Sequence, residues 1–251
     1  MLTYRTQEAI AWIAFDRPEK NNALERGVYR ELRDLLSLAQ VDGGVRCVVI
    51  HGNGPCFSAG GDIEEFATIG GVADRRDYML DAISAYRAVE SCTKPVIAAV
   101  HGYALGGGCE MTLVCDIVIA DETARFGMPE AKVGLVPGPG VARGLAQANL
   151  HWMKLMVLAG ETIDAEEARL AGLVNRIVPA GQHLAAAEAL ALRVASLAPV
   201  AQAVGKQLLN SVAPEGYAHA TDAIALLQST EDFQEGIAAF TSKRAPEFAG
   251  Q

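Results

Sequence analysis

The feature that most constrains the fold is an alternation of short apolar runs and amphipathic stretches in the first half of the chain. Apolar runs typical of buried strands occupy residues 9–15, 45–50, 95–100 and 116–120. Apolar residues with helical spacing occupy residues 24–39 and 75–89. Strands separated by helices favour parallel pairing through right-handed crossovers. The residues alone therefore predict an α/β fold with a plain layered parallel sheet.

The pattern changes beyond about residue 180, where strand signals stop. Helical patterns occupy residues 184–197, 200–209, 217–227 and 230–241. Pro199 and Pro214 fall between these stretches, at places where proline interrupts a helix. The sequence thus predicts an α/β core followed by a helical C-terminal segment, without a long flexible linker between them.

Charge and apolar content exclude several classes of protein. The formal net charge is −9, and no stretch concentrates lysine or arginine, which argues against a nucleic-acid partner. The N-terminus lacks a signal-peptide pattern, and no apolar run is long enough to span a membrane. The five cysteines form no CxxC pair, and we interpret them as reduced apolar residues. We therefore expect a cytoplasmic protein.

Several familiar motifs are missing from the sequence. Residues 138–144 contain three glycines but break the GxGxxG spacing of nucleotide loops. The five histidines have no metal-ligand spacing, so we expect no metal site. Ser58 lacks the GxSxG surroundings of a serine nucleophile.

Two glycine-containing segments, residues 56–63 and 101–110, each follow a predicted strand. Small residues at the carboxyl ends of parallel strands let a ligand approach the backbone closely, although glycines there can also serve only to make tight turns. Gly106 and the two glycines after it precede a helical run, whose first N–H groups favour negative charge. The amides of Gly61 and Gly107 could together hold a carbonyl oxygen that becomes an oxyanion.

Two glutamates are candidates for proton transfer. Glu110 lies in a helical run that is apolar nearly all round, and burial favours a carboxyl group with a raised pKa. The alternative is a carboxylate paired with arginine or one that caps the first helical turn. Glu130 follows Pro129, which by itself is an ordinary helix start. Two carboxyl groups in different environments can divide acid and base roles.

Taken together, these residues resemble the enoyl-CoA hydratase/isomerase (crotonase) superfamily. The resemblance extends over essentially the whole chain, and its most specific part is the run from Gly106 to Glu110 with Pro129-Glu130 about twenty positions later. The other matching pieces are Arg17-Pro18, Asn22-Ala23-Leu24, residues 57–63, residues 94–105, Cys115-Asp116, Glu231-Asp232, Glu235-Gly236, Phe240 and residues 243–248.

The resemblance implies a fold different from a plain layered sheet. It predicts a crotonase-like spiral of ββα turns with two roughly perpendicular sheets, followed by helices that build trimers or dimers of trimers. On this basis residues 1–195 form the core with the coenzyme A and catalytic site, and residues 196–251 form the oligomerisation segment. The implied substrate is an acyl-CoA thioester, so coenzyme A is part of the substrate and no separate cofactor is expected.

The resemblance also assigns roles to individual residues. The thioester oxygen would lie between the amides of Gly61 and Gly107. Glu110 would activate water for attack at C3, and Glu130 would protonate C2. The residues implied in substrate binding are Ala23, Leu24, Ala59, Gly60, Asp62, Ile63, Tyr103, Gly106 and Pro129.

Glutamate at both acid positions favours a 2-enoyl-CoA hydratase. The alternatives are an acyl-CoA isomerase, another thioester enzyme of this family that uses the same oxyanion hole, or a non-catalytic acyl-CoA-binding protein. The sequence departs from the hydratase pattern at residues 138–143 and at Lys20-Asn21, and Pro139 and Val141 are expected to alter the shape of the acyl pocket. We also predict a mobile flap at residues 67–72.

Overall fold

A computed structural model describes residues 1–138, 147–211 and 230–251 of the chain. The expected helix at 217–227 and the expected effect of Pro139 and Val141 on the pocket lie outside these described residues.

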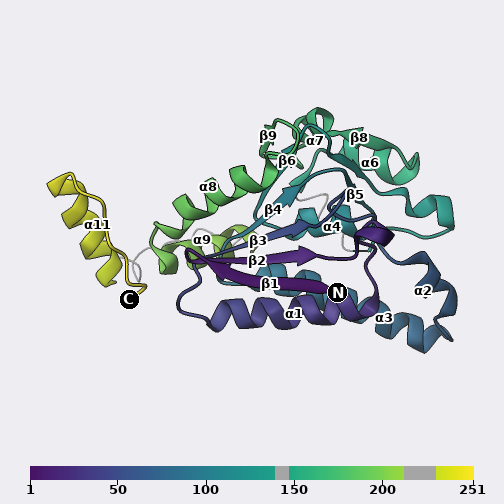
Figure 1. Cartoon of the computed structure of the whole chain (residues 1–251), viewed down its shortest axis with the longest axis horizontal. Helices are drawn as coiled ribbons and strands as arrows, with labels where there is room; N and C mark the ends of the chain where they lie inside the picture. Colours follow the sequence, from purple (N-terminus) through teal and green to yellow (C-terminus); the bar gives the residue numbers. More distant parts are fainter. Residues whose placement is uncertain (139–146, 212–229) are drawn as a thin grey trace.

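The larger sheet has six strands in the order β1-β2-β3-β4-β6-β9 (Figure 1). Its strands are β1 (Leu2–Gln7), β2 (Ile10–Phe15), β3 (Cys47–Gly52), β4 (Val96–Val100), β6 (Ile117–Asp121) and β9 (Arg176–Val178). β1 pairs antiparallel with β2, and every other neighbouring pair is parallel. The four strands predicted from apolar runs are therefore confirmed, because a strand buried on both faces is apolar along its whole length.

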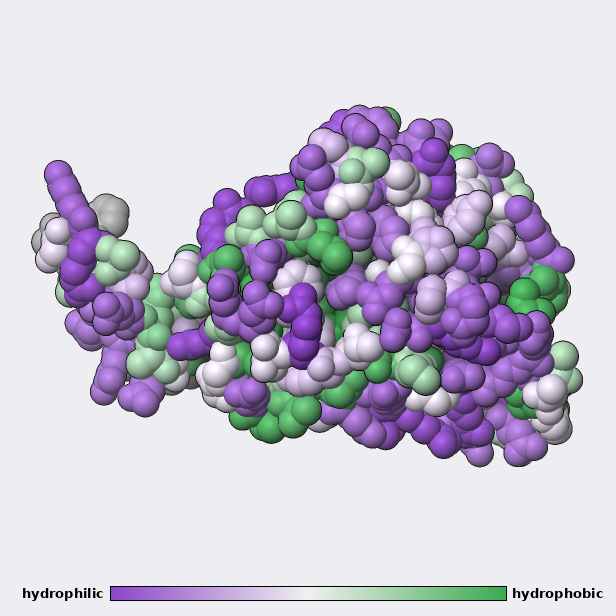
Figure 2. Space-filling view, in the orientation of Figure 1, coloured by the Kyte–Doolittle hydropathy of each residue, from purple (hydrophilic) through white to green (hydrophobic). Residues whose placement is uncertain are grey.

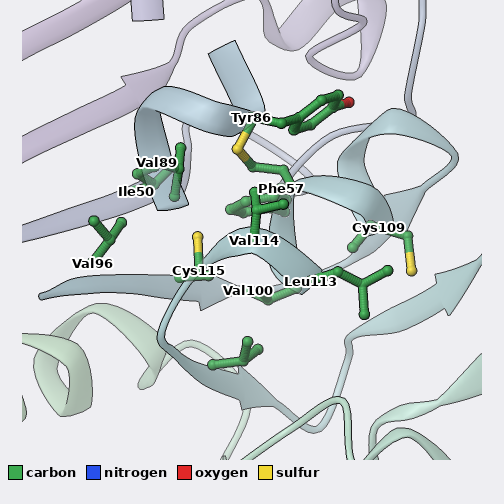
Figure 3. Packing of buried hydrophobic residues seen from close by; sticks show 14 of the residues in the cluster. Ile50, Phe57, Tyr86, Val89, Val96, Val100, Cys109, Leu113, Val114 and Cys115 are labelled. Carbon is green, nitrogen blue, oxygen red and sulfur yellow. The ribbon is translucent and has the colours of Figure 1, made fainter. Parts of the chain in front are cut away.

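Each face of this sheet is covered by helices. Ile13, Ile50 and Ala98 point to the face that packs against α1 (Arg26–Val41) and α3 (Val72–Ser91). Trp12 and Val49, on alternate positions, point to the face covered by α8 (His183–Ala195). Successive side chains of a strand alternate between faces, so the sheet has a core on both sides. Figure 3 shows part of the first core, with Ile50, Phe57, Val100 and Tyr86 labelled.

A second sheet of three short strands departs from the plain layered fold. It contains β5 (Tyr103–Leu105), β7 (Arg125–Gly127) and β8 (Thr162–Asp164), in that order. β5 pairs parallel with β7, and β7 pairs antiparallel with β8. The expectation of a single parallel sheet was therefore wrong, and the two-sheet fold implied by the family resemblance is confirmed.

The remaining helices connect the strands and extend the C-terminal part. They are the short 3₁₀ helices η1 (Pro18–Lys20) and η2 (Pro129–Val133), with α2 (Ile63–Thr68), α4 (Gly107–Val114), α6 (Leu150–Leu158), α7 (Ala165–Ala171), α9 (Pro199–Asn210) and α11 (Glu231–Ser242). The helices expected at 184–197, 200–209 and 230–241 are confirmed as α8, α9 and α11, with small shifts of their ends. In Figure 1, α11 lies apart from the layered core, at the end of the molecule. The expected flap at residues 67–72 includes the end of α2 and the start of α3, and its mobility remains a prediction.

The surface in Figure 2 is mainly hydrophilic, with smaller hydrophobic patches between the polar residues. Within the described ranges, no single helix has the length and hydropathy of a membrane span, although α8 and α9, bent by 109°, pass that test as a pair on length and composition alone.

Candidate active site

The two glycine-containing segments lie side by side because their backbones are hydrogen-bonded. The Phe57 N–H donates to His101 O at 2.8 Å, and the Ser58 N–H donates to Tyr103 O at 2.8 Å. In return, the Leu105 N–H donates to Ser58 O at 2.9 Å. This short parallel pairing brings the loop after β3 against the loop after β4, as expected for loops at the carboxyl ends of neighbouring parallel strands.

Glycine is required at the contact between these loops. Gly60 and Gly106 have φ angles of +95° and +49°, in the region that favours glycine. A Cβ atom on Gly60 would lie only 2.7 Å from Leu105 O and 3.3 Å from Gly107 N. The glycines therefore do more than make tight turns, since they let the two backbones approach each other.

Two backbone N–H groups at this contact are available to a ligand. Gly107 is the first residue of α4, where N–H groups have no partner within the helix. In the described part of the chain, neither the Gly61 N–H nor the Gly107 N–H donates to an internal acceptor. Both residues line the same pocket.

Glu110 lies in the first turn of α4, whose residues are all buried. The buried helix predicted from its apolar sequence is therefore confirmed. Glu110 itself is only 6 % exposed, and it lines the pocket that contains Gly61 and Gly107.

Glu130 lies in η2 and lines the same pocket from a different part of the chain. Its Oε2 atom is buried without a hydrogen-bond partner among the described residues. Burial raises the pKa of this carboxyl group above its ordinary value of 4.5, because the charged form loses solvation. Glu130 is thus both the start of a short helix, as its sequence indicates, and a carboxyl group with an altered pKa.

The raised pKa of Glu130 predicts a pH-dependent cost to stability. Between pH 4.5, its ordinary pKa, and the raised native pKa, the native state binds more protons than the unfolded state. The free energy of unfolding should therefore fall as the pH rises through this window. Glu130→Gln removes this titration, so its stability relative to the unmodified protein should increase through the same window and then level off. Urea unfolding at a series of pH values measures this, and a difference independent of pH would contradict it.

The pocket has a volume of about 340 Å³ and is lined mainly by apolar side chains. Of the residues expected at the site, it brings together Ala59, Gly60, Gly61, Ile63, Gly106, Gly107, Glu110, Pro129 and Glu130. A pocket of this size with a few converging polar groups is typical of a small-molecule site.

Comparison with known proteins identifies the family. The sequence profile described as enoyl-CoA hydratase/isomerase matches residues 5–251. The chain belongs to this family. It is 37 % identical to the 2,3-dehydroadipyl-CoA hydratase of Escherichia coli, with 98 % of this chain and 97 % of that protein covered. It is 34 % identical to the short-chain-enoyl-CoA hydratase of Clostridium acetobutylicum, with 94 % and 92 % covered.

Solved structures agree with the family assignment. The crystal structure of an enoyl-CoA hydratase from Bacillus anthracis superimposes with a TM-score of 0.95 at 30 % identity, covering 100 % of this chain and 99 % of that one. A structure described as an enoyl-CoA hydratase/carnithine racemase from Magnetospirillum magneticum gives a TM-score of 0.93 at 32 % identity, covering 100 % and 96 %. The crotonase fold is therefore shown for this enoyl-CoA hydratase/isomerase family member.

Four of the expected substrate-binding residues do not line the pocket, namely Ala23, Leu24, Asp62 and Tyr103. Leu24 is buried beside it, where its N–H donates to Gly60 O at 2.8 Å and its carbonyl accepts the Asp62 N–H at 3.0 Å. Tyr103 is 50 % exposed and lies in a different hollow. Neither Ala23 nor any glycine that lines the candidate active-site pocket lines the hollow that contains Tyr103.

Asp62 has a structural function that the sequence did not reveal. Its carboxylate accepts the N–H groups of Glu64 and Glu65 at the start of α2 and binds Arg17 Nη1 at 2.6 Å. Burial by itself would raise the pKa of Asp62, but the hydrogen bonds from Arg17 and the two amides outweigh burial and lower it. Asp62 therefore fixes the loop that carries Gly61.

More than half of the residues that line the pocket were not predicted from the sequence. Tyr29, Tyr78 and Tyr86 line it, and so do Phe66, Met79, Ala82, Lys132, Val133, Leu135, Val136 and Gly138. The tyrosines occupy core-facing positions of α1 and α3. Their helical spacing is therefore a signal of burial, and nothing in the sequence distinguishes burial in the core from burial beside a ligand pocket.

Proposed function

We propose that this protein is an enoyl-CoA hydratase, which adds water reversibly to a 2-enoyl-CoA thioester and gives a 3-hydroxyacyl-CoA. The observation that carries the proposal is that two carboxyl groups, Glu110 and Glu130, and two available amides, Gly61 and Gly107, line one pocket. Relatives named as enoyl-CoA hydratases support the same reaction. The reaction forms a C3–O bond and a C2–H bond from one water molecule, so it balances without a cofactor.

The proposed oxyanion hole consists of the Gly61 and Gly107 N–H groups. Attack at C3 moves electron density onto the thioester oxygen, and two preorganised donors stabilise that charge in the transition state. The position of Gly107 at the start of α4 adds the favourable end of the helix dipole.

The proposed proton transfers use one glutamate for each bond. Glu110 orients water and removes its proton as the oxygen attacks C3, and Glu130 donates a proton to C2. Burial of Glu130 supports its role as the acid, because a raised pKa retains the proton at a higher pH. The two residues exchange roles in dehydration.

The remaining assignments extend this proposal to the whole chain. We propose that the coenzyme A moiety passes Ala23, Leu24, Ala59, Gly60, Asp62 and Ile63, and that Gly106 and Pro129 contribute to substrate binding. Tyr103 is left out of this proposal because it lies in a different hollow. Residues 1–195 would form the catalytic unit, and residues 196–251 would build a homotrimer or a dimer of trimers. The five cysteines are all buried and unpaired, which suits the reducing cytoplasm.

A panel of enoyl-CoA thioesters tests the reaction. We expect loss of the conjugated thioester absorbance and a product heavier by one water molecule. A product of unchanged mass would indicate double-bond isomerisation, and fragments would indicate carbon–carbon cleavage. Binding of every thioester without turnover would indicate a non-catalytic acyl-CoA-binding protein.

A further inference from the structure

Helix α3 carries a buried hydroxyl group that contacts the loop of one proposed oxyanion-hole amide. The Tyr86 hydroxyl donates to Gly107 O at 3.0 Å, and Tyr86 is only 2 % exposed. A Cβ atom on Gly107 would lie 3.0 Å from this hydroxyl, so the two groups are closely packed. Figure 3 shows the Tyr86 ring with its hydroxyl oxygen in red.

The same helix contacts the other loop through Tyr78, about two turns earlier. The Tyr78 hydroxyl donates to Leu24 O at 3.1 Å. Leu24 pairs with Gly61 in a short parallel bridge, because its N–H and carbonyl bond to the residues on either side of that glycine. Each loop of the proposed oxyanion hole is therefore hydrogen-bonded, directly or through Leu24, to one rigid helix.

Tyr29 of α1 lies between the two α3 tyrosines. Its ring makes edge contacts with Tyr78 and Tyr86, at centroid distances of 6.0 Å and 5.9 Å. Its hydroxyl lies beside that of Tyr86, because a Cβ atom on Gly107 would be 3.2 Å from the Tyr29 hydroxyl and 3.0 Å from the Tyr86 hydroxyl. Burial and the charge of Glu110 both raise the pKa values of Tyr29 and Tyr86, so these hydroxyl groups stay neutral and can donate.

We propose that Tyr78 and Tyr86 are positioning residues that set the relative placement of the Gly61 and Gly107 amides. This inference rests on the proposed oxyanion hole. Phenylalanine could fill the same core space, whereas a buried hydroxyl group is costly unless it is hydrogen-bonded. The partner of each hydroxyl is a backbone carbonyl in or beside a loop that carries one of the two amides, and donors in such a site must be placed accurately to stabilise transition-state charge.

Phenylalanine substitutions test the proposal without removing the aromatic rings. We expect Tyr86→Phe and Tyr78→Phe each to lower kcat by about tenfold with KM changed less than about twofold, because the amides act mainly in the transition state. Tyr29→Phe should lower kcat less, because it keeps the ring contact with Tyr86. It should add little in the Tyr86→Phe background, because the two hydroxyl groups lie side by side at Gly107. The matched control is Tyr4→Phe, since the buried Tyr4 hydroxyl has no hydrogen-bond partner among the described residues; it should leave kcat unchanged.

A spectroscopic readout separates positioning from simple stability. An aryl-substituted enoyl-CoA thioester absorbs at longer wavelength when its carbonyl oxygen is hydrogen-bonded, and we expect a smaller shift in both α3 variants than in the unmodified enzyme. Variants that lose thermal stability but keep the full shift and kcat would overturn the positioning role. Absence of hydration and of any shift in the unmodified protein would instead contradict the proposed function.

Discussion

Replacing Glu130 with glutamine is expected to lower the kcat of hydration by about a thousandfold, within the range for loss of a general acid. Glutamine has nearly the same shape but carries no transferable proton, so KM should change little. The substitution also removes the carboxyl group whose pKa is raised by burial. Steady-state loss of the enoyl thioester absorbance measures the effect. Urea unfolding of the same variant shows whether it remains folded at the pH of the assay.

Two matched glutamine substitutions complete the experiment. Glu110→Gln should lower kcat to a similar extent, since it removes the proposed base. Glu188→Gln is the control, because Glu188 is half-buried on α8, which covers the opposite face of the sheet from α1 and α3. Wild-type kcat in Glu110→Gln and Glu130→Gln would exclude the proposed mechanism.

The separate roles of the two glutamates can be distinguished by proton exchange at C2. A saturated acyl-CoA has no double bond to which water can add. Its C2 protons can still exchange with deuterated solvent, because the Glu130 carboxylate can remove a C2 proton and return a deuteron. Glu110→Gln should therefore retain much of this exchange, and Glu130→Gln should lose it. The reverse pattern would exchange the assignments of the two residues.

The parts of the fold that the sequence predicts are those in which local pattern and burial agree. β2, β3 and β4 are fully buried, and their continuous apolar runs locate them within a few residues. β5, β7 and β8 have only three residues each, which is too short for a periodic pattern. β5 also lies in a segment whose sequence indicates a glycine loop. It forms a strand only through its pairing with β7, a tertiary contact that the local sequence does not reveal.

The residues of the candidate site also form two groups: those that a local sequence pattern predicts, and those that only the folded chain brings together. The apolar sequence of α4 is enough to identify Glu110 as a buried carboxyl group. Glu130 has only the sequence of a helix start, and its place in the same pocket as Glu110 is a property of the folded chain. The hydroxyl partners of Tyr78 and Tyr86 lie 54 and 21 residues away in the sequence, so no local pattern could reveal them.

Gly106 lies between the backbone of the proposed oxyanion hole and Glu130, one of the two proposed catalytic glutamates. Its φ of +49° and ψ of −124° are accessible to glycine but strained for alanine. A Cβ atom at this position would also lie 3.1 Å from Glu130 Oε1. One added methyl group should therefore disturb both the start of α4, where Gly107 lies, and the Glu130 carboxyl group.

Gly106→Ala is accordingly expected to lower kcat by about a hundredfold and to lower the free energy of unfolding by about 1–3 kcal/mol. Gly27→Ala provides a matched control, because Gly27 lies in α1 and a Cβ atom added there would have no other atom within 4 Å. That control should keep wild-type kcat and gain up to about 1 kcal/mol of stability. Urea unfolding and steady-state hydration measure both effects. A preorganised oxyanion hole does not tolerate displacement of its donors. Wild-type kcat in Gly106→Ala would therefore contradict a preorganised oxyanion hole at the start of α4.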